Sequence, residues 1–373
     1  MKVRIVGAGP SGSVAAISAM RSGHEAELHE EHARAGYPQH CSGLISKEGL
    51  GSLSDMLDYE PHVINRISCA SFDFAGEKFE IRRKTDTAFV IDRAEFDAAL
   101  AQKAEEEGAR MFYGKRYLHT GGTGSWKPEA IIGADGALSA TARHFNFPKI
   151  RKFAFTLKAR AKIMSEEPHK VSLFYDNRNF PGFFGWLIPH DECEAEIGMG
   201  TTRQEHLAPG FRFLLKKLKP DSYEKPAGKV IPLHPREKTA GVFGRTNVLL
   251  AGDAAGHVKA SSGGGVVFGT AGARLAGALA HSPSEYEAAW RREISRDMLA
   301  HRFLQGFFEI QPNPALALTA GISRRLGLDY LFSLHGNMDR PTRIFASALS
   351  KAFNSPGAAN REGESIGAGK DAG

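Results

Sequence analysis

The chain has 373 residues and a formal net charge of +6; 42% of its residues are hydrophobic and 24% are charged. This composition excludes a disordered or low-complexity chain, and the length predicts two or three domains. A membrane-spanning helix is also excluded. The apolar stretch from Gly265 to Ala280 is interrupted by Arg274 and stays short of the ~20 apolar residues that a span requires.

The cysteines and the first residues indicate where the protein works. Cys41, Cys69 and Cys193 show neither metal-ligand nor disulfide spacing, which predicts no metal site and a reducing compartment. The chain begins directly with a predicted strand, so we expect no signal peptide and a cytoplasmic protein. The positive charge suits an anionic surface, an acidic protein or a phosphorylated substrate, and equally an ordinary solvated surface. Because no basic-aromatic cluster is present, we expect no nucleic-acid partner.

The first 30 residues carry the strongest motif. A predicted strand at Lys2–Val6 is followed by the sequence GAGPSG at residues 7–12 and an Ala-rich helix to Met20. Glycines in such a turn let backbone N–H groups and a helix N-terminus approach a pyrophosphate, where a Cβ would collide. Seventeen residues separate Gly12 from Glu30, which ends a second predicted strand and can accept hydrogen bonds from ribose hydroxyls.

The alternative for this stretch is a glycine-rich turn in an ordinary βα unit. Because the strand, the spacing, the helix and the acid all agree, we predict a dinucleotide site. A carboxylate at Glu30 favours an unphosphorylated ribose, as in FAD or NAD rather than NADP.

Residues 32–46 form a predicted loop that holds Cys41 between His40 and Ser42. Loops beside a cofactor site often carry function. Two interpretations of Cys41 stay open: a tuned thiol that faces the cofactor, or a small side chain buried in a tight turn.

A second segment that we expect to face the cofactor follows further along the chain. A strand over residues 88–91 leads into a helix over residues 93–107, whose apolar positions recur every four residues. Arg93 lies at the start of this helix, where the helix dipole disfavours a cation. We therefore expect Arg93 to face a pyrophosphate, or else to pair with Glu95 or Asp97.

The middle of the chain predicts an antiparallel sheet. A hairpin is expected over residues 68–81, and alternating segments follow one another over residues 151–234. Within them, residues 181–189 (PGFFGWLIP) concentrate aromatic and branched side chains. This segment is either the wall of an apolar ligand site or an ordinary sheet core.

An acid beside a glycine ends two further strands. Asp135-Gly136 follows a predicted strand over residues 130–133, and Gly252-Asp253 follows a strand that begins at Asn247. A triple glycine at residues 263–265 then starts a helix. Asp253 can hold a ribityl hydroxyl, and the glycines allow backbone N–H groups to approach a ring or a phosphate.

In this order and spacing, the motifs resemble the FAD-binding set of p-hydroxybenzoate-hydroxylase-type flavoproteins. Within that group the chain is most similar to the geranylgeranyl reductases, including the archaeal digeranylgeranylglycerophospholipid reductases. Residues 36–43 resemble the family's flavin-side cysteine loop, with Ser42 in place of a glycine. Residues 181–189 resemble its P-x-x-Y-x-W-x-F substrate motif, with Phe184 and Ile188 in place of the Tyr and the second aromatic. The resemblance covers about residues 1–290.

The resemblance implies an α/β (α+β) fold with an FAD-binding Rossmann-like domain, an inserted antiparallel β-sheet substrate domain and a C-terminal helical region. The expected parts are the FAD-binding domain (1–67, 88–150 and 235–283), the substrate domain (68–87 and 151–234), the C-terminal helices (284–353) and a disordered tail (354–373).

The implied activity is FAD-dependent saturation of C=C bonds in geranylgeranyl chains of membrane-lipid precursors, by hydride transfer from reduced flavin plus protonation. An isolated alkene is hard to polarise, so the protein must orient it in a dry tunnel and supply an acid. Cys41 is the predicted catalytic residue, and Phe184, Trp186 and Ile188 are the predicted substrate-binding residues. The predicted FAD-binding residues are Gly7, Gly9, Ser11, Gly12, Glu30, Cys41, Ser42, Gly43, Arg93, Tyr117, Asp135, Gly136, Gly252, Asp253, Gly264, Gly265 and Val266.

The remaining expectations concern partners and rival functions. Because no second nucleotide fingerprint is present, the reductant, NAD(P)H or a ferredoxin, is expected to dock transiently. A long helix is predicted over residues 284–311, and residues 316–353 are predicted to be helices that close the substrate lobe, with a secondary, peripheral contact to the membrane. The rival functions are an FAD-dependent aromatic monooxygenase of the same fold and a non-catalytic isoprenoid-binding flavoprotein.

Overall fold

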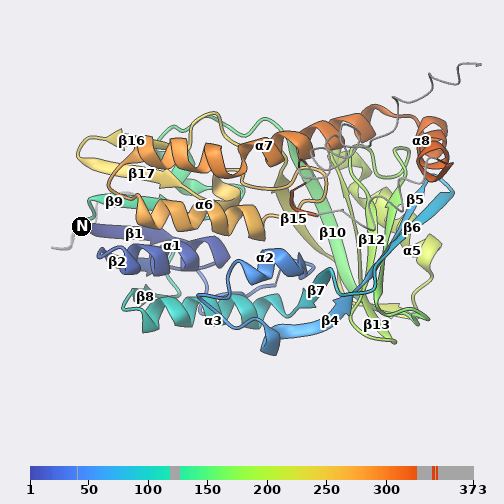
Figure 1. The fold of residues 1–373 in the computed structure, drawn as a ribbon, viewed down its shortest axis with the longest axis horizontal. Helices are drawn as coiled ribbons and strands as arrows, with labels where there is room; N and C mark the ends of the chain where they lie inside the picture. The colour runs from blue at the N-terminus through green and yellow to red at the C-terminus, as the bar shows by residue number, and fades with distance from the viewer. Residues whose placement is uncertain (40, 118–126, 326–337, 341, 343–373) are drawn as a thin grey trace, which may run out of the picture.

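The computed structural model describes residues 1–39, 41–117, 127–325, 338–340 and 342. A six-stranded sheet covered by helices lies beside an eight-stranded sheet, and a long helix, α7 (Pro283–Ile310), runs along both (Figure 1). The predicted mixed α/β fold is confirmed.

The six-stranded sheet has the order β16-β17-β9-β1-β2-β8. Its strands are β1 (Lys2–Val6), β2 (Glu25–His29), β8 (Arg110–Phe112), β9 (Ala130–Gly133), β16 (Ala240–Phe243) and β17 (Thr246–Leu250). All pairs are parallel except the β16–β17 hairpin. Strand β9 is apolar and buried at all four positions, as expected for a parallel strand covered on both faces, whereas β1 and β2 carry the ion pair between Arg4 and Glu27.

Helices cover one face of this sheet. The covering helices are α1 (Pro10–Arg21), α3 (Arg93–Glu106), α6 (Val266–Ala278) and α7. A smaller apolar cluster that includes Phe147 and a residue of the short helix α4 (Ala140–His144) packs against the opposite face. The Asp92 carboxylate accepts hydrogen bonds from the N–H groups of Ala94 and Glu95, which explains why α3 begins at Arg93.

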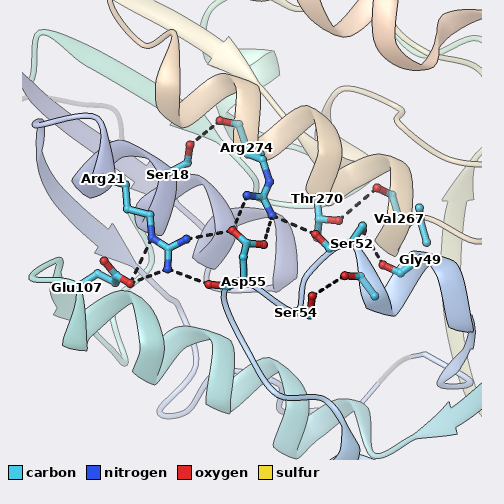
Figure 2. Close-up of polar contacts among 11 residues, drawn as sticks. Ser18, Arg21, Gly49, Ser52, Ser54, Asp55, Glu107, Val267, Thr270 and Arg274 are labelled. Atoms are coloured by element: carbon cyan, nitrogen blue, oxygen red, sulfur yellow. Dashed lines mark hydrogen bonds and ion pairs between the residues drawn. The ribbon is translucent and has the colours of Figure 1, made fainter.

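Ion pairs hold α1 and α6 to the loop that follows α2 (Lys47–Gly51). Figure 2 shows Asp55 of this loop between Arg21 of α1 and Arg274 of α6, and Arg21 also reaches Glu107. Both oxygens of Asp55 accept from Arg274 at 2.8 Å. The hydrogen bonds from Arg274 lower the pKa of Asp55. The loop after α2, the residue after α3 and helix α6 are thereby fixed around the N-terminal βα unit, although they are far apart in the chain.

The eight-stranded sheet has the order β14-β10-β13-β12-β11-β5-β6, and β15 pairs with the same edge of β10 as β14. Its strands are β5 (Cys69–Phe74), β6 (Glu77–Arg82), β10 (Phe153–Lys162), β11 (Lys170–Tyr175), β12 (Gly185–Pro189), β13 (Glu194–Thr201), β14 (Ser222–Tyr223) and β15 (Ala227–Pro232). The predicted hairpin at residues 68–81 forms β5 and β6. The prediction of an antiparallel sheet needs one correction, because β5 joins β11 in parallel after a long crossover.

The two faces of this sheet have different neighbours. Helix α5 (Leu207–Leu218) packs on one face through Phe211 and Leu214. The other face packs on a three-stranded sheet of β3 (Leu44–Ser46), β7 (Ala88–Ile91) and β4 (Val63–Ile67), which the sequence analysis did not predict. The face that packs on the three-stranded sheet is the one turned toward the six-stranded sheet (Figure 1).

The C-terminal part begins with the predicted long helix. Helix α7 ends at Ile310, before Pro312, and α8 (Asn313–Arg325) follows it. Short 3-10 turns lie at Glu60–His62, Gln204–His206 and Gly252–Ala254. Among the helices described, not one has the length and apolar character needed to cross a membrane. Most of the predicted helical stretch over residues 316–353 beyond α8, and the predicted tail over residues 354–373, lie outside the described residues.

Candidate functional site

A cleft of about 400 Å³ opens where the parallel strands β1, β2 and β9 end. Its lining combines the glycine loop after β1, the residues after β2 and β9, and the loop that holds Cys41. Arg93 and Asp97 of α3 and Lys229 of β15 complete it. The carboxyl ends of the strands of an open parallel sheet are where such folds bind ligands.

The glycine loop after β1 fits a pyrophosphate. A Cβ on Gly7 would lie 2.5 Å from the Ala134 oxygen, and one on Gly12 would lie 1.7 Å from the Gly7 oxygen, so protein packing explains both glycines. Gly9 differs, because a Cβ there would meet no described atom within 4 Å. Gly9 lines the cleft at the N-terminus of α1, and its predicted role, close approach of a ligand to the bare backbone, stays a prediction.

Glu30 lies where the motif predicts it, directly after β2 and in the lining of the cleft. Its Oε2 accepts a hydrogen bond from the Ala8 N–H at 2.8 Å. Its Oε1 accepts from the His32 N–H at 3.0 Å and lies 2.7 Å from the His32 ring nitrogen Nδ1. The carboxylate is thus held against the glycine loop, and its predicted contact with a ribose stays a prediction.

Arg93 shows the alternative that the sequence left open. Its Nε and Nη2 donate to the two oxygens of Asp97 at 3.0 and 2.9 Å, and both residues are buried. Burial raises the pKa of the Asp97 carboxyl, and the guanidinium of Arg93 works against this rise. Glu95 instead pairs with Arg34. Arg93 still lines the cleft, so the ion pair leaves its predicted role in FAD binding untested.

Asp135 and Tyr117 line the cleft and also make hydrogen bonds within the protein. The Asp135 carboxylate accepts from the Ser139 hydroxyl at 2.6 Å and from the Thr141 N–H at 2.8 Å, which holds the turn into α4. Asp135, Gly136 and Tyr117 line the cleft. The Tyr117 hydroxyl accepts from Arg4 Nη1 at 3.2 Å. Asp135 therefore shapes the backbone that faces the ligand.

The second glycine-rich anchor meets the first one. A Cβ on Gly252 would lie 2.4 Å from the Ser11 hydroxyl oxygen, so the two turns are in direct contact. Asp253 Oδ2 lies 3.5 Å from Nζ of Lys229, a cleft residue that the sequence analysis missed. Gly264, Gly265 and Val266 form the start of α6. Asp253 and these three residues do not line the cleft.

Cys41 is half-buried and lines the cleft. Ser42 and Gly43 lead from it into β3, and the Gly43 oxygen accepts from the Ile91 N–H at 3.1 Å. The Cys41 main-chain oxygen accepts from Nζ of Lys158 at 2.7 Å. The structure thus brings Cys41 to the cleft, whereas His40 lies outside the described residues.

A buried charge pair lies directly behind Cys41. Lys158 Nζ on β10 donates to Glu196 Oε2 on β13 at 2.6 Å, and Trp186 Nε1 on β12 donates to Glu196 Oε1 at 3.1 Å. Burial raises the pKa of Glu196, and Lys158 opposes this rise. This pair was not predicted from the sequence, although a Lys and a Glu at strand positions among apolar residues offered a signal.

The predicted substrate residues are packed in the core. Phe184, Trp186 and Ile188 are 6%, 8% and 4% exposed and belong to the apolar cluster between the eight-stranded and three-stranded sheets. The three side chains are therefore buried in an apolar cluster between two sheets. Their role as a substrate wall stays a prediction.

Comparison with known proteins shows the family of this chain. No family model matches the chain. A geranylgeranyl diphosphate reductase of Rhodobacter capsulatus is 30% identical over 296 residues, which is 73% of this chain and 73% of that protein. The chain belongs to the geranylgeranyl reductase family.

Other members of the geranylgeranyl reductase family are similar over comparable lengths. Digeranylgeranylglycerophospholipid reductase 1 of Methanopyrus kandleri is 28% identical and covers 74% of this chain and 80% of its own length. The solved structure of a geranylgeranyl bacteriochlorophyll reductase-like protein from Thermoplasma acidophilum has a TM-score of 0.79 and 17% identity, and covers 95% of this chain and 96% of its own. At this identity the solved structure shows a common fold.

This geranylgeranyl reductase-family protein is an FAD-dependent oxidoreductase, and its cleft fits FAD. The open face of Gly9, the N-terminus of α1 and the carboxylate of Glu30 are the groups that a dinucleotide requires. FAD supplies hydride chemistry once it is reduced. Cys41, through its contact with Lys158, and Lys229 of β15 link the cleft to the eight-stranded sheet.

Proposed function

We propose that the protein saturates C=C bonds of geranylgeranyl chains carried by membrane-lipid precursors. The observation that supports this most is the placement of Cys41. It lines the FAD cleft, and Lys158 and Glu196 connect it to Trp186, the residue that matches the family's substrate motif. The names of the similar proteins, a geranylgeranyl diphosphate reductase and a digeranylgeranylglycerophospholipid reductase, support the same class of substrate.

Each part of the site has a role in this proposal. The glycine loop and Glu30 would hold the FAD pyrophosphate and ribose, and bound FAD would supply hydride chemistry. Cys41 holds a proton on Sγ and delivers it to the second alkene carbon. The apolar cluster that includes Phe184, Trp186 and Ile188 excludes water from the alkene. Orientation is the main contribution of the protein, because an isolated alkene has no group that can accept electron density.

The proposal is tested with the purified, FAD-loaded protein without oxygen. The flavin is reduced with dithionite, a digeranylgeranylglyceryl phospholipid or geranylgeranyl diphosphate is added, and flavin reoxidation is followed together with lipid mass. We expect reoxidation with a gain of two mass units per double bond. Cys41→Ala should slow saturation by about 100-fold if Cys41 is the acid. Cys193→Ala, at an exposed cysteine, is the matched control.

Other outcomes would decide for the rival functions. If the flavin stays reduced until air enters and a hydroxylated product then forms, the protein is a monooxygenase. If the FAD-loaded protein binds prenyl lipid but yields neither a saturated nor a hydroxylated product, the non-catalytic isoprenoid-binding flavoprotein replaces the enzyme. Normal saturation by Cys41→Ala would remove Cys41 from the mechanism while leaving the reductase function in place.

A membrane surface is the proposed source of the substrate. One face of α7 exposes Leu299, Phe303 and Ile310, which are 62%, 72% and 76% exposed, and Arg292 and Arg296 precede them on the same face. Spacings of three, four and seven residues place these side chains on one side of the helix. An apolar stripe beside arginines is the pattern of a helix that lies on an anionic lipid surface.

The electron donor is proposed to dock transiently. NAD(P)H and a reduced ferredoxin are the two candidates, since the sequence carries a single nucleotide fingerprint at residues 7–12. The net charge of +6 supports an acidic protein donor.

A further inference from the structure

Three neighbouring strands of the eight-stranded sheet align a tryptophan, a glycine and a lysine. Gly198 of β13 lies opposite Trp186 of β12 on one side and opposite Lys158 of β10 on the other. A Cβ on Gly198 would lie 2.3 Å from the Trp186 ring, so the indole lies across this glycine. The ring therefore extends toward the strand that carries Lys158.

Glu196 connects the ends of this row. Two residues before Gly198 on the same strand, its carboxylate accepts from the Trp186 indole with one oxygen and from Lys158 Nζ with the other. The side chains of Lys158 and Glu196 are 14% and 6% exposed. Charge-assisted hydrogen bonds in such surroundings are short and directional, so Lys158 has little freedom to move.

Lys158 uses a second N–H to hold the loop of Cys41. It donates to the Cys41 main-chain oxygen at 2.7 Å across 117 residues of sequence. Other residues of this loop contact α3 and β7: Tyr37 donates to Glu95 of α3, and the Gly43 oxygen accepts from the Ile91 N–H of β7. Lys158 thus ties the middle of the loop to the eight-stranded sheet.

We propose that Lys158, held in place by Glu196, is a positioning residue that sets the location of the Cys41 thiol at the cleft beside Trp186. A main-chain contact at Cys41 itself controls where its side chain begins, so a change at Lys158 moves the thiol without touching it. This inference rests on the proposed function for its meaning in catalysis, but the position of the thiol is measurable without substrate.

The test compares alkylation of two cysteines in one protein. The FAD-loaded wild type and the double variant Lys158→Met/Glu196→Gln are treated with iodoacetamide across pH, and the modified peptides are quantified by mass spectrometry. The double variant removes both charges, so no unpaired buried charge remains, and the amide oxygen that Glu196→Gln introduces still accepts from Trp186. Exposed Cys193 serves as the internal reference. We expect the ratio of Cys41 to Cys193 modification to change by about tenfold.

The matched control is Arg160→Met. Arg160 and Glu194 form an ion pair on the same two strands, with side chains that are 48% and 37% exposed. This variant should leave the Cys41 rate within about twofold of the wild type, because an exposed pair contributes little. The single variant Lys158→Arg should keep most of the wild-type alkylation rate of Cys41, because a cation at this place still positions the loop.

Two results would overturn the proposal. The first is an unchanged ratio in a double variant that is folded and loaded with FAD. The second is a loss of FAD and of thermal stability without any change in the Cys41 rate per loaded molecule, which would show a purely structural pair. If the double variant does not fold, Glu196→Gln alone is used, and an unchanged ratio there also rejects the proposal.

The same variants separate this inference from the proposed function. If the wild type fails to saturate any prenyl chain, the proposed function is rejected, while the alkylation ratio still reports on Lys158. If the wild type is active, the double variant should lower kcat for saturation by about tenfold with KM unchanged, because the position of an acid matters only to the chemical step.

Discussion

The three glycines of the loop after β1 are needed for different physical reasons. Gly7 and Gly12 are required by the protein itself, since a Cβ at either would overlap a main-chain oxygen. Gly9 faces the cleft, where the described structure leaves room for a Cβ. A single sequence motif therefore combines folding and binding requirements, and substitution can separate them.

We predict that Gly9→Ala folds normally but binds FAD at least about tenfold more weakly, because its methyl group enters the space of the pyrophosphate. Gly12→Ala should instead lose about 3 kcal/mol or more of unfolding free energy, because the new Cβ overlaps the Gly7 oxygen. FAD titration and urea unfolding of the apoprotein measure the two effects. Equal loss of stability in both variants would contradict this assignment.

Helices α7 and α8 carry apolar side chains on a packed face and also on an exposed face. Phe308 of α7 and Leu316 and Ala320 of α8 pack against aromatic side chains of β5 and β6. The opposite side of each helix is exposed, with Phe303 and Ile310 on α7 and Leu318 on α8. Figure 1 shows both helices on the outside of the molecule: α7 runs from the six-stranded sheet to the eight-stranded sheet, and α8 lies beside β5 and β6. A surface at this place would bring lipid close to the predicted substrate domain.

We predict that Phe303→Ser/Ile310→Ser weakens binding to anionic phospholipid vesicles by at least about tenfold, because each apolar side chain contributes about 1.5 kcal/mol or more when it is buried in lipid. Co-sedimentation with vesicles measures this, and added salt should weaken the arginine contribution. Val242→Ser is the matched control, since Val242 is 64% exposed on β16 at the other end of the molecule (Figure 1). Equal vesicle binding by both variants would exclude this face.

Two buried histidines join α7 to the rest of the molecule. His257 packs against Trp290 of α7 with ring centroids 4.7 Å apart. Nδ1 of His301 on α7 lies 2.7 Å from the Ser261 hydroxyl oxygen, and its Nε2 lies 3.1 Å from the Asp339 main-chain oxygen. Burial lowers the pKa of His257 to about 3 and that of His301 to about 4, so both are neutral in the fold. Lys259, which pairs with Asp339, also lowers the pKa of His301.

We predict that the free energy of unfolding falls as the pH is lowered from about 6.5 to about 4. In this range the unfolded chain takes up protons on both histidines while the folded protein does not, so protonation favours unfolding. Urea unfolding at pH 7.5 and pH 5 measures the difference. His301→Gln should reduce the pH dependence, because glutamine keeps a polar partner for Ser261 and does not titrate in this range. Equal pH dependence in wild type and variant would show that His301 is not one of the groups responsible.

Local patterns in the sequence determined much of the cofactor site. The glycine loop, the position of Glu30 and the capped start of α3 depend on residues close together in the chain, so spacing alone predicts them. The end of α7 before Pro312 follows from the same kind of rule, since proline cannot continue the helix. The order of these motifs also indicated the family.

Only the tertiary structure decided which distant side chains meet. The choice of Asp97 as the partner of Arg93 was still local, because residues four apart on α3 lie on one face of the helix. Lys158 and Lys229 could not be assigned to the site, because their contacts with Cys41 and Asp253 depend on how the eight-stranded sheet lies against the FAD cleft. Spacing within one element is set by local geometry, whereas contacts between elements depend on the packing of the whole chain.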